Sequence, residues 1–182
     1  MEKLIIFGVF SIAIIIISWR TLFHVRSHGF YRFFSWECLL WLFINNAQYW
    51  FYKPFRYPQV YSWALLIISA YFVVAGLILM KKVGKPEKGR AQKHLFQFEE
   101  TSELVDTGIF KYIRHPMYSS LLFLTWAVFL KSPTEPLFVV ALLSTVCLYF
   151  TAIFDEKDCI NYFGDRYKQY MKRSKMFIPF IV

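Results

Sequence analysis

The stretch from Gly108 to Tyr118 gathers side chains that bind charged ligands. It reads Gly-Ile-Phe-Lys-Tyr-Ile-Arg-His-Pro-Met-Tyr and lies where a basic polar segment meets an apolar run. Pro116 suits the first turn of a helix, where no backbone N–H is needed. Arg114 and His115 are therefore expected at the N-terminal end of that helix, where unpaired N–H groups favour anionic ligand groups. The stretch predicts a binding site for a charged ligand.

A structural role for the same residues is the alternative. Arg114 is long enough to reach lipid phosphates from the end of a membrane helix. Tyr112 and Tyr118 would then belong to the aromatic belt at the membrane edge. For an isolated Arg-His-Pro this interpretation is preferred, so the choice depends on what else the fold brings to this helix end.

The composition is that of a polytopic membrane protein. Hydrophobic residues make up 57% of the 182-residue chain, aromatic residues make up 21%, and the mean hydropathy is +0.40. The net charge of +9 comes from basic residues between apolar runs, which favours membrane orientation over nucleic-acid binding. Cys38, Cys147 and Cys159 form no CxxC or paired pattern, so we expect neither a disulfide framework nor a zinc or other metal site.

The predicted fold class is an all-α integral membrane protein with five transmembrane helices, a cytoplasmic interfacial loop and a C-terminal amphipathic helix. We expect one membrane domain over 1–182. Within it, residues 1–82 hold three spans, and residues 83–182 hold a polar loop, a helical hairpin and the tail. The predicted spans are Leu4–Trp19, Phe33–Tyr52, Val60–Met80, Met117–Leu130 and Leu137–Phe154.

Charge and local sequence predict how these spans lie in the membrane. Lys3 precedes the first apolar run as in a signal peptide, but no small-residue cleavage site follows, so we expect an uncleaved span. Seventeen of the 21 Lys and Arg residues fall in 20–32, 81–114 and the tail, on one side of a five-span protein. That side is predicted to be cytoplasmic, with the N-terminus outside. Phe96 to Glu100 is amphipathic enough to lie on the membrane surface.

Polar residues interrupt the second predicted span. Glu37 lies about one turn into it, and Asn45, Asn46 and Gln48 lie near its far end. Polar groups at membrane depth usually face protein or a cavity, while the alternative places all four in the interface zones. Both interpretations stay open. Because only this span is polar, a transporter or channel is disfavoured.

A short connection makes the fourth and fifth spans an antiparallel hairpin. Only 131–136 separates them, so the start of one and the end of the other lie side by side. Arg114 and His115 therefore face the acidic run Asp155-Glu156-Lys157-Asp158, which we place at a helix C-terminus. A salt bridge from Arg114 to Asp155 or Glu156 that staples the hairpin would be the structural explanation, although an exposed bridge is worth little.

The same arrangement suits a zwitterionic cofactor. An amino-acid moiety needs a carboxylate for its ammonium group and N–H donors for its own carboxylate. A sulfonium adds a positive charge that favours acidic or aromatic surroundings. S-adenosylmethionine combines these features, so it is the cofactor that the constellation predicts.

The ordered motifs between about Leu104 and Pro179 resemble the isoprenylcysteine carboxyl methyltransferase family, within a wider group that includes phospholipid N-methyltransferases. The motifs are Gly108-x-Phe110-x-Tyr112-x-Arg114-His115-Pro116-Met117-Tyr118, Asp155-Glu156-x-Asp158, Phe163-Gly164-Asp165-x-Tyr167-x-x-Tyr170 and Ile178-Pro179. Where the family usually has Glu-Glu, this chain has Asp155-Glu156.

The resemblance implies an S-adenosylmethionine pocket closed by the C-terminal tail. It also implies that Glu156 binds the amino group of the cofactor and that Asp155 belongs to the same binding site. Arg114 would bind a charged group of the cofactor or the substrate. Arg114 and Glu156 are therefore the expected catalytic residues. The pocket lining implied by the motif is Tyr112, His115, Pro116, Met117 and Tyr118.

The implied reaction is methyl transfer to a lipophilic acceptor such as a prenylated cysteine carboxylate, with the bilayer as partner. A carboxylate or thiolate acceptor needs no general base, whereas an amine acceptor must lose a proton and would make His115 a candidate base. A phospholipid amine acceptor, a non-enzymatic membrane scaffold and a nicotinamide-dependent reductase remain as alternatives. Residues 84–89 lack the spacing and the Lys-Ser/Thr end of a phosphate loop.

Overall fold

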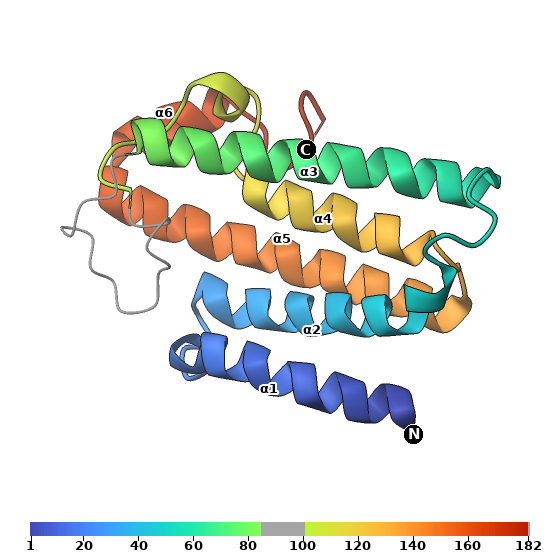
Figure 1. Cartoon of the computed structure of the whole chain (residues 1–182). Coiled ribbons are helices and arrows are strands. Elements are labelled where there is room, and N and C mark those ends of the chain that lie inside the picture. Colours follow the sequence, from blue (N-terminus) through green and yellow to red (C-terminus); the bar gives the residue numbers. More distant parts are fainter. Residues whose placement is uncertain (85–100, 182) are drawn as a thin grey trace.

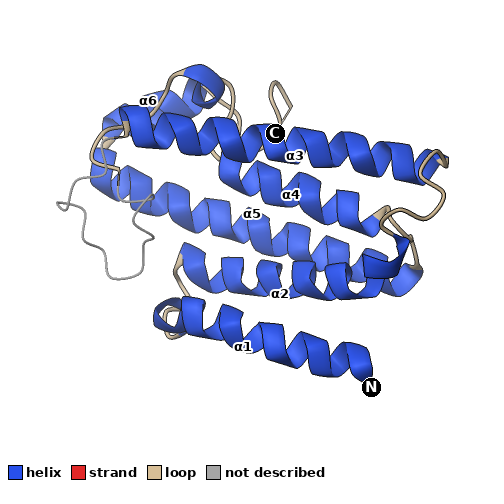
Figure 2. Cartoon of the chain, in the orientation of Figure 1, coloured by secondary structure: helices blue, strands red, loops and turns tan. Residues whose placement is uncertain are grey.

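The computed structural model describes residues 1–84 and 101–181, and these form helices joined by loops, without a strand (Figure 2). The predicted interfacial segment Phe96–Glu100 lies outside the described residues. The helices are α1 (Glu2–Leu22), α2 (His28–Asn46), α3 (Tyr57–Val83), α4 (Pro116–Phe129), α5 (Glu135–Phe163) and α6 (Asp165–Arg173), with short 3-10 helices η1 (Ala47–Tyr49) and η3 (Gly108–Lys111).

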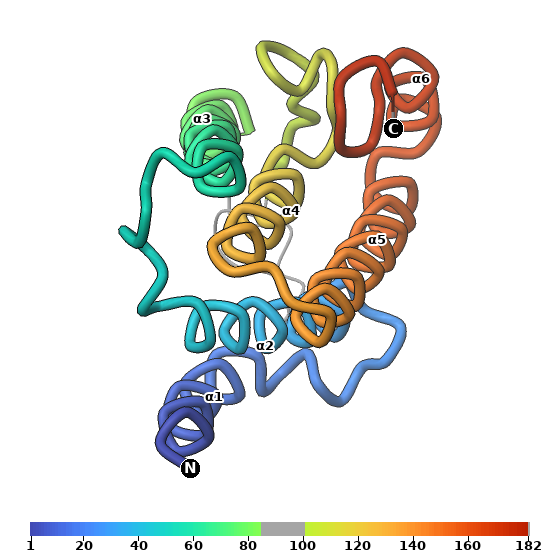
Figure 3. Tube along the Cα trace, turned by 90° about the vertical axis from the view of Figure 1, so that its right-hand side faces the viewer, coloured from blue at the N-terminus to red at the C-terminus, as the bar shows by residue number. Residues whose placement is uncertain are grey.

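The long helices run side by side, and α6 lies across one end of them (Figure 1). Helix α1 packs against α2, and α2 packs against α5. Helix α4 lies between α3 and α5, as the turned view also shows (Figure 3). The start of α4 and the last turns of α5 therefore meet at the end that carries α6, as the hairpin prediction required.

Helices α1, α3 and α5 are long and apolar enough to cross a membrane, with 21, 27 and 29 residues. Helix α4 is apolar but has 14 residues, and α2 is less apolar because it carries Arg32 and Glu37. The all-helical, membrane-type architecture is thus confirmed. Five spans and their orientation stay predictions.

Local sequence explains where the helices begin. The Ser27 hydroxyl caps α2 by accepting from the Phe30 amide, at 3.3 Å. Proline stands in the first turn of α3, α4 and α5, where its missing N–H costs no hydrogen bond. At α4 that proline is Pro116, which fixes the helix start directly after Arg114 and His115.

Two boundaries differ from the sequence prediction. Helix α5 continues to Phe163, two turns beyond the end of its apolar run, so Asp155 and Glu156 lie inside the helix and not at its C-terminus. The predicted C-terminal amphipathic helix is not one continuous helix. Gly164, with a φ of +62°, ends α5 and begins α6, which itself ends at Arg173 well before Pro179.

Close packing and small polar side chains join α3 to α4. Ser62 and Ser69 of α3 donate to the carbonyls of Ala127 and Ser120, both at 2.7 Å. A Cβ added at Gly76 would lie 3.3 Å from both Pro116 Cγ and Met117 Sδ. Helix α3 therefore lies directly against the residues that open α4.

The polar residues of α2 take up separate contacts. Glu37 accepts from the Ser11 hydroxyl of α1 at 2.8 Å, so it faces α1 and not Arg114. Asn46 is fully buried and donates to the Val128 carbonyl of α4 at 3.0 Å. Asn45 donates to Trp41 of its own helix, and Gln48 is exposed. Glu37 and Asn46 thus face protein, as the first of the two interpretations expected.

Candidate functional site

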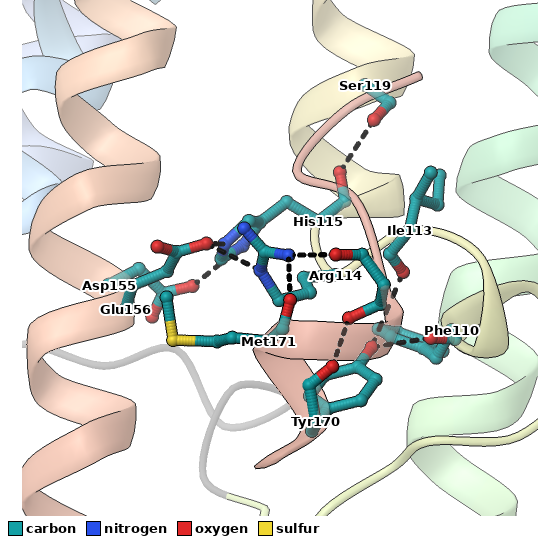
Figure 4. Close-up of polar contacts among 10 residues, drawn as sticks. Phe110, Ile113, Arg114, His115, Ser119, Asp155, Glu156, Tyr170 and Met171 are labelled. Atoms are coloured by element: carbon teal, nitrogen blue, oxygen red, sulfur yellow. Dashed lines mark hydrogen bonds and ion pairs between the residues drawn. The ribbon is translucent and has the colours of Figure 1, made fainter. Parts of the chain in front are cut away.

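Arg114 and His115 meet the acidic turn of α5, as the hairpin predicts (Figure 4). Arg114 Nε donates to Glu156 Oε1 at 2.7 Å, and both side chains are 9% exposed. The guanidinium also reaches the tail, where Nη1 donates to the carbonyls of Met171, at 3.4 Å, and Ser174. Arg114 therefore ties α4, α5 and the end of α6 together.

His115 is buried between two carboxylates. Its Nδ1 lies 3.3 Å from Asp155 Oδ2, and its Nε2 lies 3.3 Å from Glu156 Oε1. Burial alone would lower the pKa of His115, but the hydrogen bonds and charges of the two carboxylates raise it above the ordinary 6.5. The ring also stacks on Tyr118, with centroids 5.3 Å apart. The two carboxylates thus favour the imidazolium form of His115.

Glu156 is the acceptor shared by both cations. Burial would raise its pKa, but His115 and Arg114 together lower the pKa below the ordinary 4.5. One oxygen, Oε1, receives both contacts. Glu156 is therefore a buried, ionised carboxylate that positions Arg114 and His115.

The chain after α6 returns to the start of α4 and runs beside it. Lys175 N donates to the Tyr112 carbonyl at 2.9 Å, and the amides of Arg114 and His115 donate to the carbonyls of Lys175 and Met176, at 2.7 and 3.2 Å. The Ser119 hydroxyl holds the Phe177 carbonyl at 2.8 Å. The amides of Arg114 and His115 thus bind the tail.

Asp158 belongs to a different contact from the rest of the acidic run. It lies 3.3 Å from Nδ1 of His28, a fully buried residue at the start of α2. Two residues along a helix turn the side chain by about 200°, so Glu156 and Asp158 point to opposite sides of α5. Asp155 and Glu156 therefore contact His115, whereas Asp158 contacts His28.

A pocket opens beside this cluster. Its wall includes Arg114, His115, Pro116, Met117, Tyr118 and Asp155 of the predicted site residues. Two of the predicted residues do not line it. Glu156 lies behind the wall, and Tyr112 is 46% exposed and contacts Phe180, with ring centroids 5.8 Å apart.

The rest of the wall was not assigned from the sequence. It comes from the end of α3, the segment before η3, the last turns of α5 and α6. These residues are Met80, Thr101, Leu104, Val105, Phe110, Cys159, Phe163, Tyr167 and Tyr170. Phe110, Phe163, Tyr167 and Tyr170 belong to the motifs that carry the family resemblance, but no role was assigned to them, because helical spacing of aromatic residues alone does not distinguish a pocket wall from a packed core.

Among residues 1–84 and 101–181, no cluster of three His, Cys, Asp or Glu side chains is arranged to hold a metal ion. The polar portion of the wall instead comprises the Asp155 carboxylate, the Arg114 guanidinium and the His115 ring, whose two nitrogens contact Asp155 and Glu156. That donor set fits a zwitterionic organic ligand.

Comparison with known proteins extends over more of the chain than the motifs. A family model described as phospholipid methyltransferase matches residues 59–166, and so includes α3. Protein-S-isoprenylcysteine O-methyltransferase of Dictyostelium discoideum is 28% identical over 169 residues, which is 88% of this chain and 70% of the relative.

Two further relatives are matched over less of their length. Methanethiol S-methyltransferase 1 of Bradyrhizobium diazoefficiens is 33% identical over 87 residues, 47% of this chain and 30% of the relative. A probable protein-S-isoprenylcysteine O-methyltransferase of Oryza sativa subsp. indica is 27% identical over 124 residues, 65% of this chain and 63% of the relative. No solved structure matches.

The family model covers more than half of the chain, and its matched region contains both the Arg-His-Pro segment and the acidic turn that meets it. The resemblance found in the motifs is thereby confirmed. The chain belongs to the phospholipid methyltransferase family, together with relatives named as isoprenylcysteine and methanethiol methyltransferases.

Proposed function

We propose that this protein is an S-adenosylmethionine-dependent methyltransferase that acts on a lipophilic acceptor, such as the carboxylate of a prenylated cysteine. The observation that carries the proposal is the pocket wall shared by Arg114 and His115 at the start of α4 and Asp155 of α5. S-adenosylmethionine would supply a methyl group on a sulfonium, which an acceptor can displace directly.

The residues present fit such a cofactor. Asp155 lines the pocket and would take the ammonium group in addition to its contact with His115, whereas Glu156 does not line the pocket and contacts both Arg114 and His115. The stacked rings of His115 and Tyr118, with Pro116 and Met117, would form the flat and apolar side of the site. Of the two carboxylates expected to bind the cofactor, we therefore propose Asp155 as the partner of the ammonium group.

The state of His115 favours an acceptor that arrives already ionised. Both ring nitrogens face carboxylates, so neither has a lone pair with which to accept a proton from an amine. A carboxylate or thiolate needs no base, and the protein then has to position the acceptor and exclude water. Arg114 in the wall would attract such an anion.

Transfer to an amine lipid is the second candidate, and the name of the matching family favours it. It requires that the amine lose its proton to solvent or to a group other than His115. Its rate would rise with pH through the ordinary titration of the amine, whereas transfer to a carboxylate or thiolate that is already ionised would not.

We further propose five spans, with α2 and α4 joining the three long apolar helices, and an N-terminus outside. The pocket and the basic loops would then face the cytoplasm, in line with the distribution of Lys and Arg. The cofactor would enter from water, and the acceptor would enter from the adjacent leaflet. Residues 1–82 would shape the acceptor side, and residues 83–182 would hold the cofactor.

The test is transfer of labelled methyl groups from S-adenosylmethionine by the purified protein in lipid. The acceptors would be a prenylated N-acetylcysteine, an alkyl thiol and phosphatidylethanolamine, with NADPH binding measured in parallel. Labelling of the carboxylate or thiol is expected. Labelling of the amine lipid alone would select the second candidate. NADPH binding with no methyl transfer would favour a reductase, and inertness towards all of these would favour a membrane scaffold.

A further inference from the structure

Tyr167 of α6 is buried in the pocket wall, yet its hydroxyl makes no hydrogen bond with any residue of 1–84 or 101–181. The residue is 3% exposed. Its ring is fixed, because it stacks on Phe163 with centroids 6.5 Å apart and meets Tyr170 edge-on at 5.7 Å. The hydroxyl therefore has a defined place in the wall.

Tyr170 makes a contrast on the same helix. It is 2% exposed and also lines the pocket, but its hydroxyl donates to the Phe110 carbonyl at 2.6 Å. Tyr170 thus fastens α6 to η3. The Tyr167 hydroxyl has no acceptor among the described residues and belongs to a side chain that lines the pocket, so it can donate to a ligand bound there.

The surroundings of Tyr167 keep its hydroxyl protonated. Burial, and then the neighbouring Cys159 and the carboxylates Asp155 and Glu156, raise the pKa of Tyr167, so the phenol remains a neutral donor. The Arg114 charge acts on Tyr167 in the opposite direction, which places a cation in the same neighbourhood.

Arg114 brings further donors to this wall. Of the five N–H groups of a guanidinium, Nε is used by Glu156 and Nη1 by Met171 and Ser174. Nη2 has no acceptor in the described portion of the chain. The Tyr167 hydroxyl and the charged Nη2 group of Arg114 therefore both lack an acceptor among the described residues, and both side chains line the same pocket.

We propose that the Tyr167 hydroxyl donates a hydrogen bond to the carboxylate of a bound ligand, in the same pocket as Nη2 of Arg114. The inference rests on the proposed function. That carboxylate belongs either to the amino-acid moiety of the cofactor or to an anionic acceptor. Its chemistry is the same in both cases, so binding experiments distinguish the two sources.

The experiment compares Tyr167→Phe with Tyr170→Phe in the full chain, by calorimetry with S-adenosylhomocysteine and by thermal unfolding. Tyr167→Phe keeps the stacked ring and loses only the donor. Its thermal midpoint should match the parent, while Tyr170→Phe should unfold at a lower temperature because it loses its bond to Phe110. The ligand that carries the carboxylate, either S-adenosylhomocysteine or the acceptor, should bind Tyr167→Phe about tenfold more weakly, as for one hydrogen bond to a charged group.

Two further titrations identify the source of the carboxylate. An analogue of S-adenosylhomocysteine without its carboxylate should bind the parent and Tyr167→Phe equally if the cofactor carries the partner. If instead only a prenylated N-acetylcysteine binds Tyr167→Phe more weakly, the acceptor carries it. Either result supports the inference.

The inference is wrong if Tyr167→Phe matches the parent in every titration, or if its thermal midpoint falls as far as that of Tyr170→Phe. Failure of the parent itself to bind S-adenosylhomocysteine would overturn the proposed function, and this inference with it. That outcome is visible before any variant is compared.

Discussion

Adjacent carboxylates in this protein have different tasks because one residue along a helix turns a side chain by about 100°. Asp155 faces the pocket, Glu156 lies behind it under Arg114 and His115, and Asp158 pairs with His28. The sequence could predict that this acidic turn meets Arg114 and His115. It could not predict which carboxylate faces a ligand, since that depends on the rotation of α5.

Replacement of Arg114 by Lys should destabilise the protein. The Arg114 guanidinium donates hydrogen bonds to Glu156 and to the carbonyls of Met171 and Ser174, and the single ammonium group of lysine cannot make all of them. We expect a loss of about 2 kcal/mol in the free energy of unfolding, measured in detergent with denaturant.

Arg173→Lys is the matched control for that experiment. Its guanidinium pairs with Asp106 at a site where Arg173 is 61% exposed. An exposed pair contributes little, so Arg173→Lys should lie near the parent. Equal losses in the two variants would contradict the structural role given to Arg114.

The pH dependence of stability should carry the signature of His115. Since its pKa is raised in the folded state, its contribution is complete below the ordinary 6.5 and is lost as pH rises through the folded value. Glu156 has a lowered pKa, so its contribution is lost only in acid, below the ordinary 4.5.

We therefore expect the thermal midpoint of the parent to fall as pH is raised from about 6 to about 9. His115→Gln should give a flatter curve over the same range. If parent and variant decline in parallel, the imidazolium assignment is incorrect.

At the scale of elements, the site depends on a hairpin and on close packing by glycine. The short connection between α4 and α5 made the hairpin predictable. The extension of α5 to Phe163 could not be predicted, because charged residues mark the end of an apolar span without ending the helix. The return of 175–177 beside Tyr112 and His115 also gave no periodic signal, since it is an irregular segment held by backbone hydrogen bonds.

Gly108 should be sensitive to any side chain. It has a φ of +58°, and an added Cβ would lie 2.6 Å from Leu79 Cδ1 of α3. Gly108→Ala is expected to lower the free energy of unfolding by more than about 1 kcal/mol, and to displace the pocket segment that follows it. Chemical denaturation of the purified protein measures the loss.

Gly8→Ala is the control, because nothing lies within 4 Å of a Cβ added there in the middle of α1. Alanine is the better helix former, so this change should be neutral or slightly stabilising. A Gly108→Ala protein as stable as the parent would exclude the close α3 contact.

At the scale of the whole molecule, α6, the start of α4 and the connection between α1 and α2 lie at one end of the bundle (Figure 1). The pocket wall includes residues of α6 and of the start of α4. The distribution of Lys and Arg predicts that this end is cytoplasmic. Composition and charge were enough to predict an all-helical membrane protein. The pocket wall was less predictable, because it draws on α3, α5, α6 and the segment before η3, which are distant in sequence.

Cysteine labelling in intact cells tests the orientation. With Cys38, Cys147 and Cys159 replaced by Ala, Phe55→Cys in the exposed loop before α3 should react with an impermeant maleimide from outside. Lys168→Cys, on the exposed face of α6, should react only after the cells are opened. The reverse pattern would invert the proposed topology.

The central claim is that the start of α4 and the acidic turn of α5 jointly bind S-adenosylmethionine. The most direct measurement is calorimetry of S-adenosylhomocysteine with the parent, Asp155→Asn and Asp158→Asn. We predict one site in the parent, binding weakened about tenfold or more in Asp155→Asn by loss of a charged partner, and near-parental binding in Asp158→Asn, whose side chain faces His28. The claim is contradicted if the parent does not bind, or if the two Asn variants bind alike.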